Sequence, residues 1–118
     1  MSVNLYEETN VITQDRGKII VMLYDGAIKF LNQAINAIQR NDDEAKGRYI
    51  LRAQDIIMEL NNVLDLEAGG QVSVNLRQLY IFMWKHLNQA NVKRDADMIK
   101  KVVELLHELN QGWRAVAF

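Results

Sequence analysis

The sequence has no cysteine and no proline among its 118 residues. Without cysteine, disulfides and thiolate chemistry are excluded, and the compartment is left open. Proline is the strongest breaker of helix interiors, so its absence is consistent with long unbroken helices. No excess charge of one sign is present either, because 14 lysines and arginines nearly balance 15 acidic residues. This balance predicts neither a nucleic-acid partner nor an anionic membrane partner.

Long apolar runs are also missing, and no basic start precedes an apolar stretch. The sequence therefore predicts neither a signal peptide nor a membrane span. Apolar residues nevertheless make up 49% of the chain, which is enough for a packed core. The length predicts a single domain, and these features together predict a soluble, cytoplasmic protein.

Apolar residues recur at the spacing of amphipathic helices in four stretches. They predict helices over about residues 15–40, 43–67, 72–92 and 95–116. The connections are only a few residues long, so neighbouring helices must run antiparallel. The prediction is an all-α fold, an up-down-up-down four-helix bundle over residues 15–118 that follows a short N-terminal arm of residues 1–14.

Short polar or glycine-containing segments mark the predicted helix ends. Residues 41–43, Asn-Asp-Asp, should stop the first helix and cap the second. Gly69 and Gly70 should end the second helix, because glycine readily takes the left-handed conformation found at helix C-termini. Asp95 is the predicted cap of the fourth helix.

One stripe of apolar residues on each predicted helix should form the core. The stripes comprise Ile20, Leu23, Tyr24, Ala27, Leu31, Ala34 and Ile38; Tyr49, Ile50, Ala53, Ile56, Ile57, Leu60, Val63 and Leu64; Leu76, Leu79, Tyr80, Met83, Leu87 and Ala90; and Ile99, Val102, Val103, Leu106, Leu109 and Trp113.

Residues 79–84 read Leu-Tyr-Ile-Phe-Met-Trp, and a helix that buries one face cannot bury six consecutive apolar residues. Helical geometry turns Ile81 nearly opposite the core and leaves Trp84 at the edge of the outward face. Leu51 and Met58 of the preceding helix also point outward. Met58 and Ile81 should lie at similar height on antiparallel neighbours, so these residues form one predicted apolar strip. Exposed apolar patches usually mark interaction sites.

The first predicted helix carries a second apolar stripe beside its core stripe, formed by Ile19, Met22 and Phe30 with Gly26 between them. Such flanking residues often only broaden a core. The fourth predicted helix carries Met98, Leu105 and Val116 on one flank. If the strip is not the partner site, these two flanks, under the N-terminal arm, are the second candidate.

Two arrangements could imitate a metal or haem site. Glu104 and His107 form a Glu-x-x-His pair, but a di-iron bundle needs a second such pair and further inward glutamates. The only other histidine is His86. Met22 and His107 could supply axial ligands to haem, which leaves a redox bundle as one alternative. No nucleophile–base pair stands out, so the sequence predicts no enzyme active site, no metal and no cofactor.

The order and spacing of several segments are informative when taken together. They are Met22-Leu-Tyr-Asp-Gly-Ala-Ile-Lys-Phe-Leu31, Arg52-Ala53 with Ile57 and Glu59-Leu60, Leu64-Asp65 followed by Gly69-Gly70, Asn75-Leu76 with Leu79-Tyr80 and Met83, Ala90-Asn91, and Trp113. Across nearly the whole chain this pattern resembles the FliS family, cytoplasmic chaperones for the export of flagellin.

The resemblance implies a four-helix bundle that binds the C-terminal segment of flagellin in an apolar groove. That segment, disordered before assembly, would fold into helices against the chaperone. Binding would prevent premature polymerisation and deliver flagellin to the flagellar export apparatus for type III secretion. The family's N-terminal arm would cover part of the surface when the partner is absent, and Tyr6 matches that role. The alternative is a helical-bundle interaction protein that self-associates through the same surface.

Overall fold

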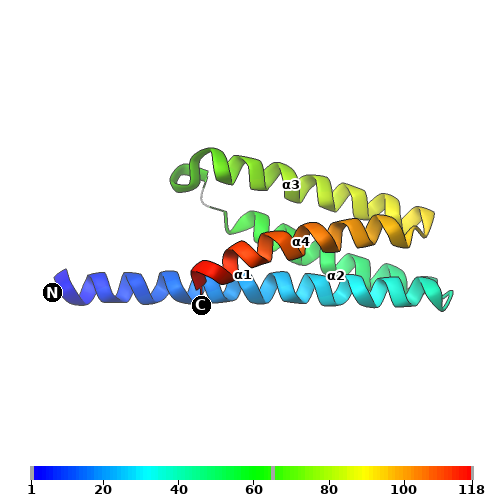
Figure 1. The fold of residues 1–118 in the computed structure, drawn as a ribbon, viewed down its shortest axis with the longest axis horizontal. Coiled ribbons are helices and arrows are strands. Elements are labelled where there is room, and N and C mark those ends of the chain that lie inside the picture. Colours follow the sequence, from blue (N-terminus) through cyan, green and yellow to red (C-terminus); the bar gives the residue numbers. More distant parts are fainter. Residues whose placement is uncertain (1, 65, 118) are drawn as a thin grey trace.

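The computed structural model describes the backbone of residues 2–64 and 66–117 and the side chains of residues 16–64 and 69–115. Its elements are α1 (Ser2–Gln39), α2 (Asp43–Asn62), α3 (Leu66–Lys93) and α4 (Ala96–Ala117) (Figure 1). No strand is present in the described backbone. The predicted all-α fold is confirmed.

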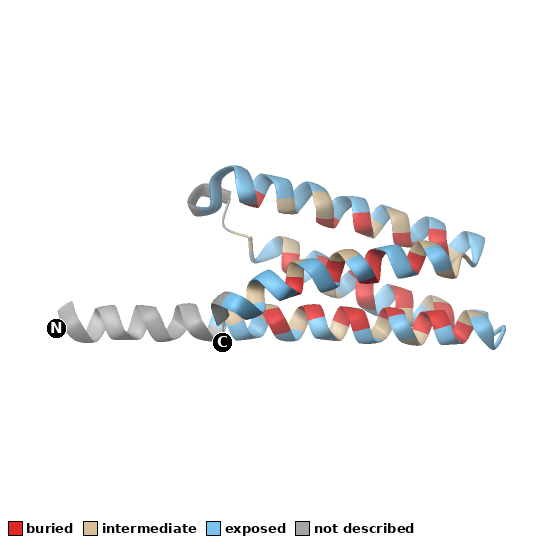
Figure 2. Cartoon of the chain, in the orientation of Figure 1, coloured by how far each residue is buried: buried red, intermediate tan, exposed pale blue. Residues whose placement is uncertain are grey.

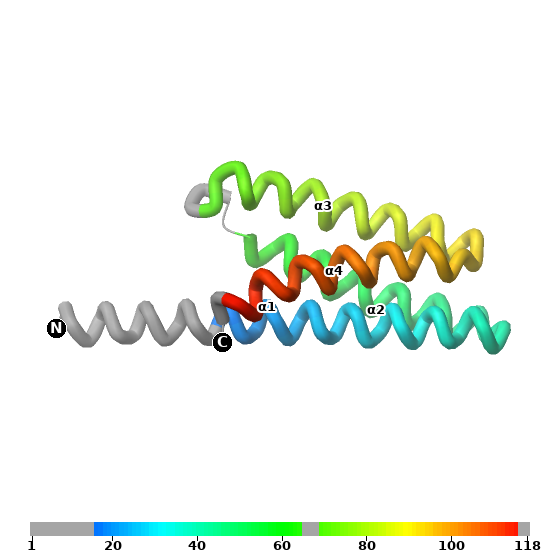
Figure 3. The backbone as a smooth tube through the Cα atoms, viewed as in Figure 1, coloured from blue at the N-terminus to red at the C-terminus, as the bar shows by residue number. Residues whose placement is uncertain are grey.

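Each of the four helices packs against two of the others, so together they form a closed bundle. The long α1 packs against α2 and α4, and α3 packs against the other sides of the same two helices. Figure 3 shows the chain turning at the same end of the bundle between α1 and α2 and between α3 and α4. Consecutive helices are therefore antiparallel, and the up-down-up-down order follows from the short connections.

The first helix begins at Ser2, whereas the sequence predicted a start near residue 15. The side chains of residues 1–15, Tyr6 among them, lie outside those that the structure describes. The prediction that residues 1–14 form an arm over an apolar surface therefore stays a prediction.

The sequence predicted that the glycine pair ends α2, and this prediction is wrong. The helix ends at Asn62, and the N–H of its C-cap residue Val63 donates to the carbonyl of Glu59. Gly70 instead lies within α3, where its φ of 54° and ψ of −132° interrupt the helix. Glycine adopts this conformation without steric cost, so Gly70 kinks α3 near its start.

The predicted core stripes are largely confirmed (Figure 2). Most of the remaining stripe residues pack half-buried against this core. Val63 is the exception, because it follows the last residue of α2 and its side chain is exposed. The buried stripe residues are Tyr24, Ala27, Leu31, Ala34, Ile50, Ala53, Ile57, Leu60, Tyr80, Met83, Leu87, Ala90, Ile99, Val102, Val103 and Leu106.

Ala37 of α1 is buried outside the predicted stripe, and so are three larger residues, Val21, Ile28 and Ile35. These three larger residues form a series. They repeat every seven residues along the side of α1 opposite its α2-facing flank, where α4 packs. A helix in contact with two neighbours buries a wider arc than a single stripe, and this second seven-residue repeat was the available signal.

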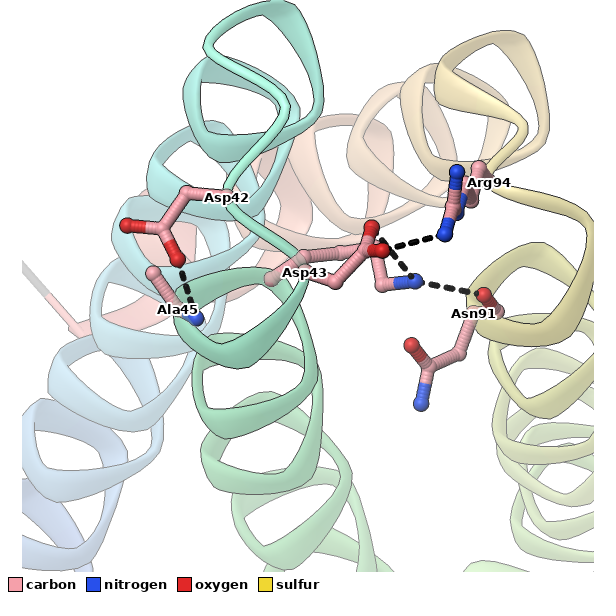
Figure 4. A network of polar contacts seen from close by, with 6 residues as sticks. Asp42, Asp43, Ala45, Asn91 and Arg94 are labelled. Carbon is pink, nitrogen blue, oxygen red and sulfur yellow. Dashed lines mark hydrogen bonds and ion pairs between the residues drawn. The ribbon is translucent and has the colours of Figure 1, made fainter.

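Polar groups close the bundle at the end where α1 meets α2 (Figure 4). Asp42 caps α2, because its Oδ1 accepts a hydrogen bond from the Ala45 N–H at 3.1 Å. The buried Lys46 donates from Nζ to the Asn91 carbonyl oxygen at 2.9 Å and lies 3.5 Å from Asp43 Oδ1. Arg94 pairs with the same aspartate. These contacts tie the start of α2 to the end of α3.

Asp95 caps α4 at the same end of the bundle, as the sequence predicted. Its Oδ1 accepts from the N–H groups of Asp97 at 3.0 Å and Met98 at 3.2 Å. Both caps satisfy donors that a helix N-terminus otherwise leaves free.

A polar contact crosses the core diagonally from α1 to α3. The hydroxyls of Tyr24 and Tyr80 are hydrogen-bonded at 2.5 Å, and Tyr24 also hydrogen-bonds with Trp113 of α4. Desolvation raises the pKa of both tyrosines above their ordinary value, and the nearby Tyr24 adds to the rise at Tyr80. The phenols are therefore held neutral and paired inside the bundle.

Candidate partner-binding surfaces

Three residues of the predicted strip are exposed. The exposed fractions are 58% for Leu51 and 40% each for Met58 and Ile81. Trp84 is half-buried, as expected for a residue at the edge of the outward face. We call Leu51, Met58, Ile81 and Trp84 the α2–α3 strip.

A buried glutamine fixes the register of the two helices beneath the strip. Gln54 Nε2 donates to the Trp84 carbonyl oxygen at 3.0 Å and to Asn88 Oδ1 at 2.8 Å. Met58 lies one turn beyond Gln54, and Ile81 lies about one turn before Trp84, so antiparallel packing sets them at similar height. Sequence reasoning missed Gln54 because its side chain is polar, although its spacing from Ile50 and Ile57 places it on the core side of α2.

Two valines extend the apolar outward face of α3. Val74 and Val92 are exposed and lie seven residues before and eleven residues after Ile81. Both spacings return a side chain to nearly the same direction at about 100° per residue. The same arithmetic that identified Ile81 would have found them.

A second exposed apolar area lies where α1 packs against α2. Ile19 and Met22 are 54% and 69% exposed. Gly26 lies between them and Phe30 and faces α2, because a Cβ at this position would lie 3.4 Å from Ile56 Cδ1. We call the outer side of this helix pair the α1–α2 seam.

The other half of the seam carries aromatic rings and cations. Phe30 of α1 and Tyr49 of α2 stack with ring centroids 6.3 Å apart. The guanidinium carbon of Arg52 lies 5.6 Å from the Phe30 centroid, and that of Arg48 lies 5.3 Å from the Tyr49 centroid. The seam therefore has an apolar half, with Ile19 and Met22, and a cationic half, with Arg48 and Arg52 over the two aromatic rings.

The structure does not bring together Met22 and His107, the two candidate haem ligands. Asp25 of α1 contacts Asn110 and Arg114 of α4, which places Met22 beyond Arg114 and about two turns from His107. Within the part of the chain that the structure describes, no three His, Cys, Asp or Glu residues are grouped to hold a metal ion. Over the same residues, no helix has the length and hydropathy of a membrane span.

Comparison with known proteins identifies similar sequences along the whole bundle. A family model described as flagellar protein FliS matches residues 2–117. A flagellar secretion chaperone FliS of Vibrio cholerae is 37% identical over 116 residues, covering 95% of this chain and 85% of that protein. Those of Salmonella typhimurium and Bacillus subtilis are 35% and 33% identical, over 93% and 92% of this chain and 82% and 80% of their own lengths.

Proposed function

The chain belongs to the FliS family of flagellar proteins, and on that basis we propose that it is a cytoplasmic export chaperone for flagellin. It binds the C-terminal segment of flagellin, prevents its premature polymerisation and delivers it to the flagellar export apparatus for type III secretion. Binding needs no cofactor and no active site, because the chaperone acts by covering an apolar segment until export.

One observation carries the proposal. Leu51, Met58 and Ile81 expose apolar side chains along two adjacent antiparallel helices. Leu51 and Met58 are seven residues apart, about 10 Å along α2, which is two turns of a partner helix as well. An amphipathic helix with apolar residues at the same spacing can bury its face on this strip. The relatives named above are flagellar secretion chaperones, which favours flagellin as the partner.

The first experiment replaces an apolar residue of the strip by a charged one. Ile81→Asp and Met58→Lys should fold with a nearly unchanged melting temperature, because both side chains already lie partly in water. Each should weaken binding of flagellin at least about tenfold, because the partner's apolar face would then bury an unpaired charge. Calorimetry with flagellin, with and without its C-terminal segment, measures the loss.

Two matched variants control for the added charge. Asn36→Asp and Gln111→Lys change exposed residues of α1 and α4, away from the strip, and should bind normally. If both strip variants fold and bind like the parent protein, the strip is not the site. If the parent protein instead dimerises in light scattering without flagellin, and Ile81→Asp abolishes the dimer, the strip serves self-association.

A further inference from the structure

The arginines in the cationic half of the α1–α2 seam are held differently from the two arginines that pair with aspartates. Arg94 pairs with Asp43, and Arg114 pairs with Asp25. Arg48 and Arg52 lie over aromatic rings instead. Among the described residues neither has an ion-pair partner, although Glu44 and Asp55 stand about one turn from them on α2.

An arginine that stacks on an aromatic ring is better placed to bind a carboxylate. A guanidinium held over a ring has lost part of its rotamer freedom, and its N–H groups can still bind a carboxylate with two hydrogen bonds. Arg48 and Arg52 are four residues apart, so their positions are separated by about 6 Å along α2. That matches carboxylates one turn apart on a partner helix.

The apolar half of the seam supplies the second part of the recognition. Met22 precedes Phe30 by eight residues on α1, which is about 12 Å along the helix. A helix of three to four turns on the seam would therefore place apolar side chains over Ile19 and Met22, and a side chain two turns further along over the arginines.

We propose that the C-terminal segment of flagellin contacts the seam as well as the α2–α3 strip, and that Arg48 and Arg52 select it by pairing with one or two of its carboxylates. The occupant is an amphipathic helix from the C-terminal segment of flagellin, apolar at one end and acidic about two turns away. This inference rests on the proposed function and adds an electrostatic requirement to it.

The test reverses both charges in the full chain. Arg48→Glu/Arg52→Glu should weaken binding of the flagellin C-terminal segment at least tenfold and remove most of its salt dependence between 50 and 500 mM NaCl. Lys93→Glu/Lys101→Glu makes the same change of charge at exposed residues of α3 and α4 and should leave binding nearly unchanged. Arg52→Lys should give an intermediate loss, because it keeps the charge and loses the planar fork.

Changes in the partner complete the test. Replacing the acidic residues of the segment by their amides should reproduce the loss with the parent chaperone. Replacing them by lysine should restore binding to the charge-reversed variant. Equal binding by the parent and by a folded Arg48→Gln/Arg52→Gln variant overturns the inference and leaves the proposed function intact. No binding of the segment by the parent protein overturns both.

Discussion

The end of the bundle where α1 turns into α2 differs from the opposite end in how it meets water. At this turn end, Asp42 and Asp95 cap two helices, and the buried Lys46 joins α2 to α3. At the opposite end, which we call the exposed end, the exposed side chains include four large apolar ones, namely Ile19, Met22, Val63 and Val72, whereas at the turn end Val92 is exposed. Polar contacts thus fix the register at one end, and apolar surface is left for a partner towards the other.

Core packing should nevertheless be equally strong towards both ends. The largest expected effect on the free energy of unfolding therefore comes from truncating a buried leucine at either end. Leu60, towards the exposed end, and Leu87, towards the turn end, are both buried. Leu60→Ala and Leu87→Ala should each lower the free energy of unfolding by about 2–5 kcal/mol, because each leaves a cavity. Urea unfolding measures this, and a loss below about 0.5 kcal/mol for Leu60→Ala alone would mean that the exposed end lacks a packed core.

The tyrosine pair, which lies in the core between the two ends, predicts that the free energy of unfolding depends on pH. Burial raises the pKa of Tyr24 and Tyr80, so the folded state holds their protons more tightly than the unfolded state does. Their contribution is complete below the unfolded pKa of about 10 and is lost as the pH rises above it, by up to about 1.4 kcal/mol per pH unit for each tyrosine. Urea unfolding at pH 8 and pH 11 measures the slope.

Tyr24→Phe/Tyr80→Phe is the control for this titration, because it removes both hydroxyls and keeps the rings. The variant should lose less stability than the parent protein between the two pH values. An equal loss would assign the slope to other groups.

The contacts of Lys46 test the turn end directly. Lys46→Met keeps most of the side-chain volume and removes the hydrogen bond to the Asn91 carbonyl oxygen. The expected loss is about 1–3 kcal/mol in the free energy of unfolding, as for a buried hydrogen bond to a charged group. Lys101→Met, at an exposed site of α4, serves as the control. Equal melting temperatures for Lys46→Met and Lys101→Met would contradict the stabilising role assigned to the Lys46 contacts.

The smallest effect is expected at the exposed end. Val72→Lys should change the free energy of unfolding by no more than about 0.5 kcal/mol, because the side chain is already in water. Thermal melting followed by circular dichroism is sufficient. A loss comparable to that of Lys46→Met would show that this valine is packed in solution.

Periodicity predicted the helices, most of the core and the exposure of the strip. Ile50, Ala53 and Ile57 repeat at helical spacing, and the same geometry turned Leu51 outward. The boundary between α2 and α3 could not be predicted in this way. A glycine pair can end a helix or kink one, and the choice depends on neighbours distant from it.

Polar contacts between helices were the other limit of sequence reasoning. Gln54 and Lys46 are buried only because α3 offers a carbonyl oxygen opposite each of them. Such a match depends on the register of two helices, which no local pattern encodes. The role of the strip and the seam in binding stays a prediction, because exposure alone does not name what covers a surface.

The two tryptophans of the chain give it two optical reporters in different surroundings. Trp84 lies at the edge of the α2–α3 strip, whereas Trp113 hydrogen-bonds with Tyr24 inside the bundle. A partner on the strip would change the emission of Trp84, while unfolding would separate Trp113 from its tyrosine. Trp84→Phe and Trp113→Phe would isolate the two signals, so partner binding and bundle opening could be followed by intrinsic fluorescence in one unlabelled sample.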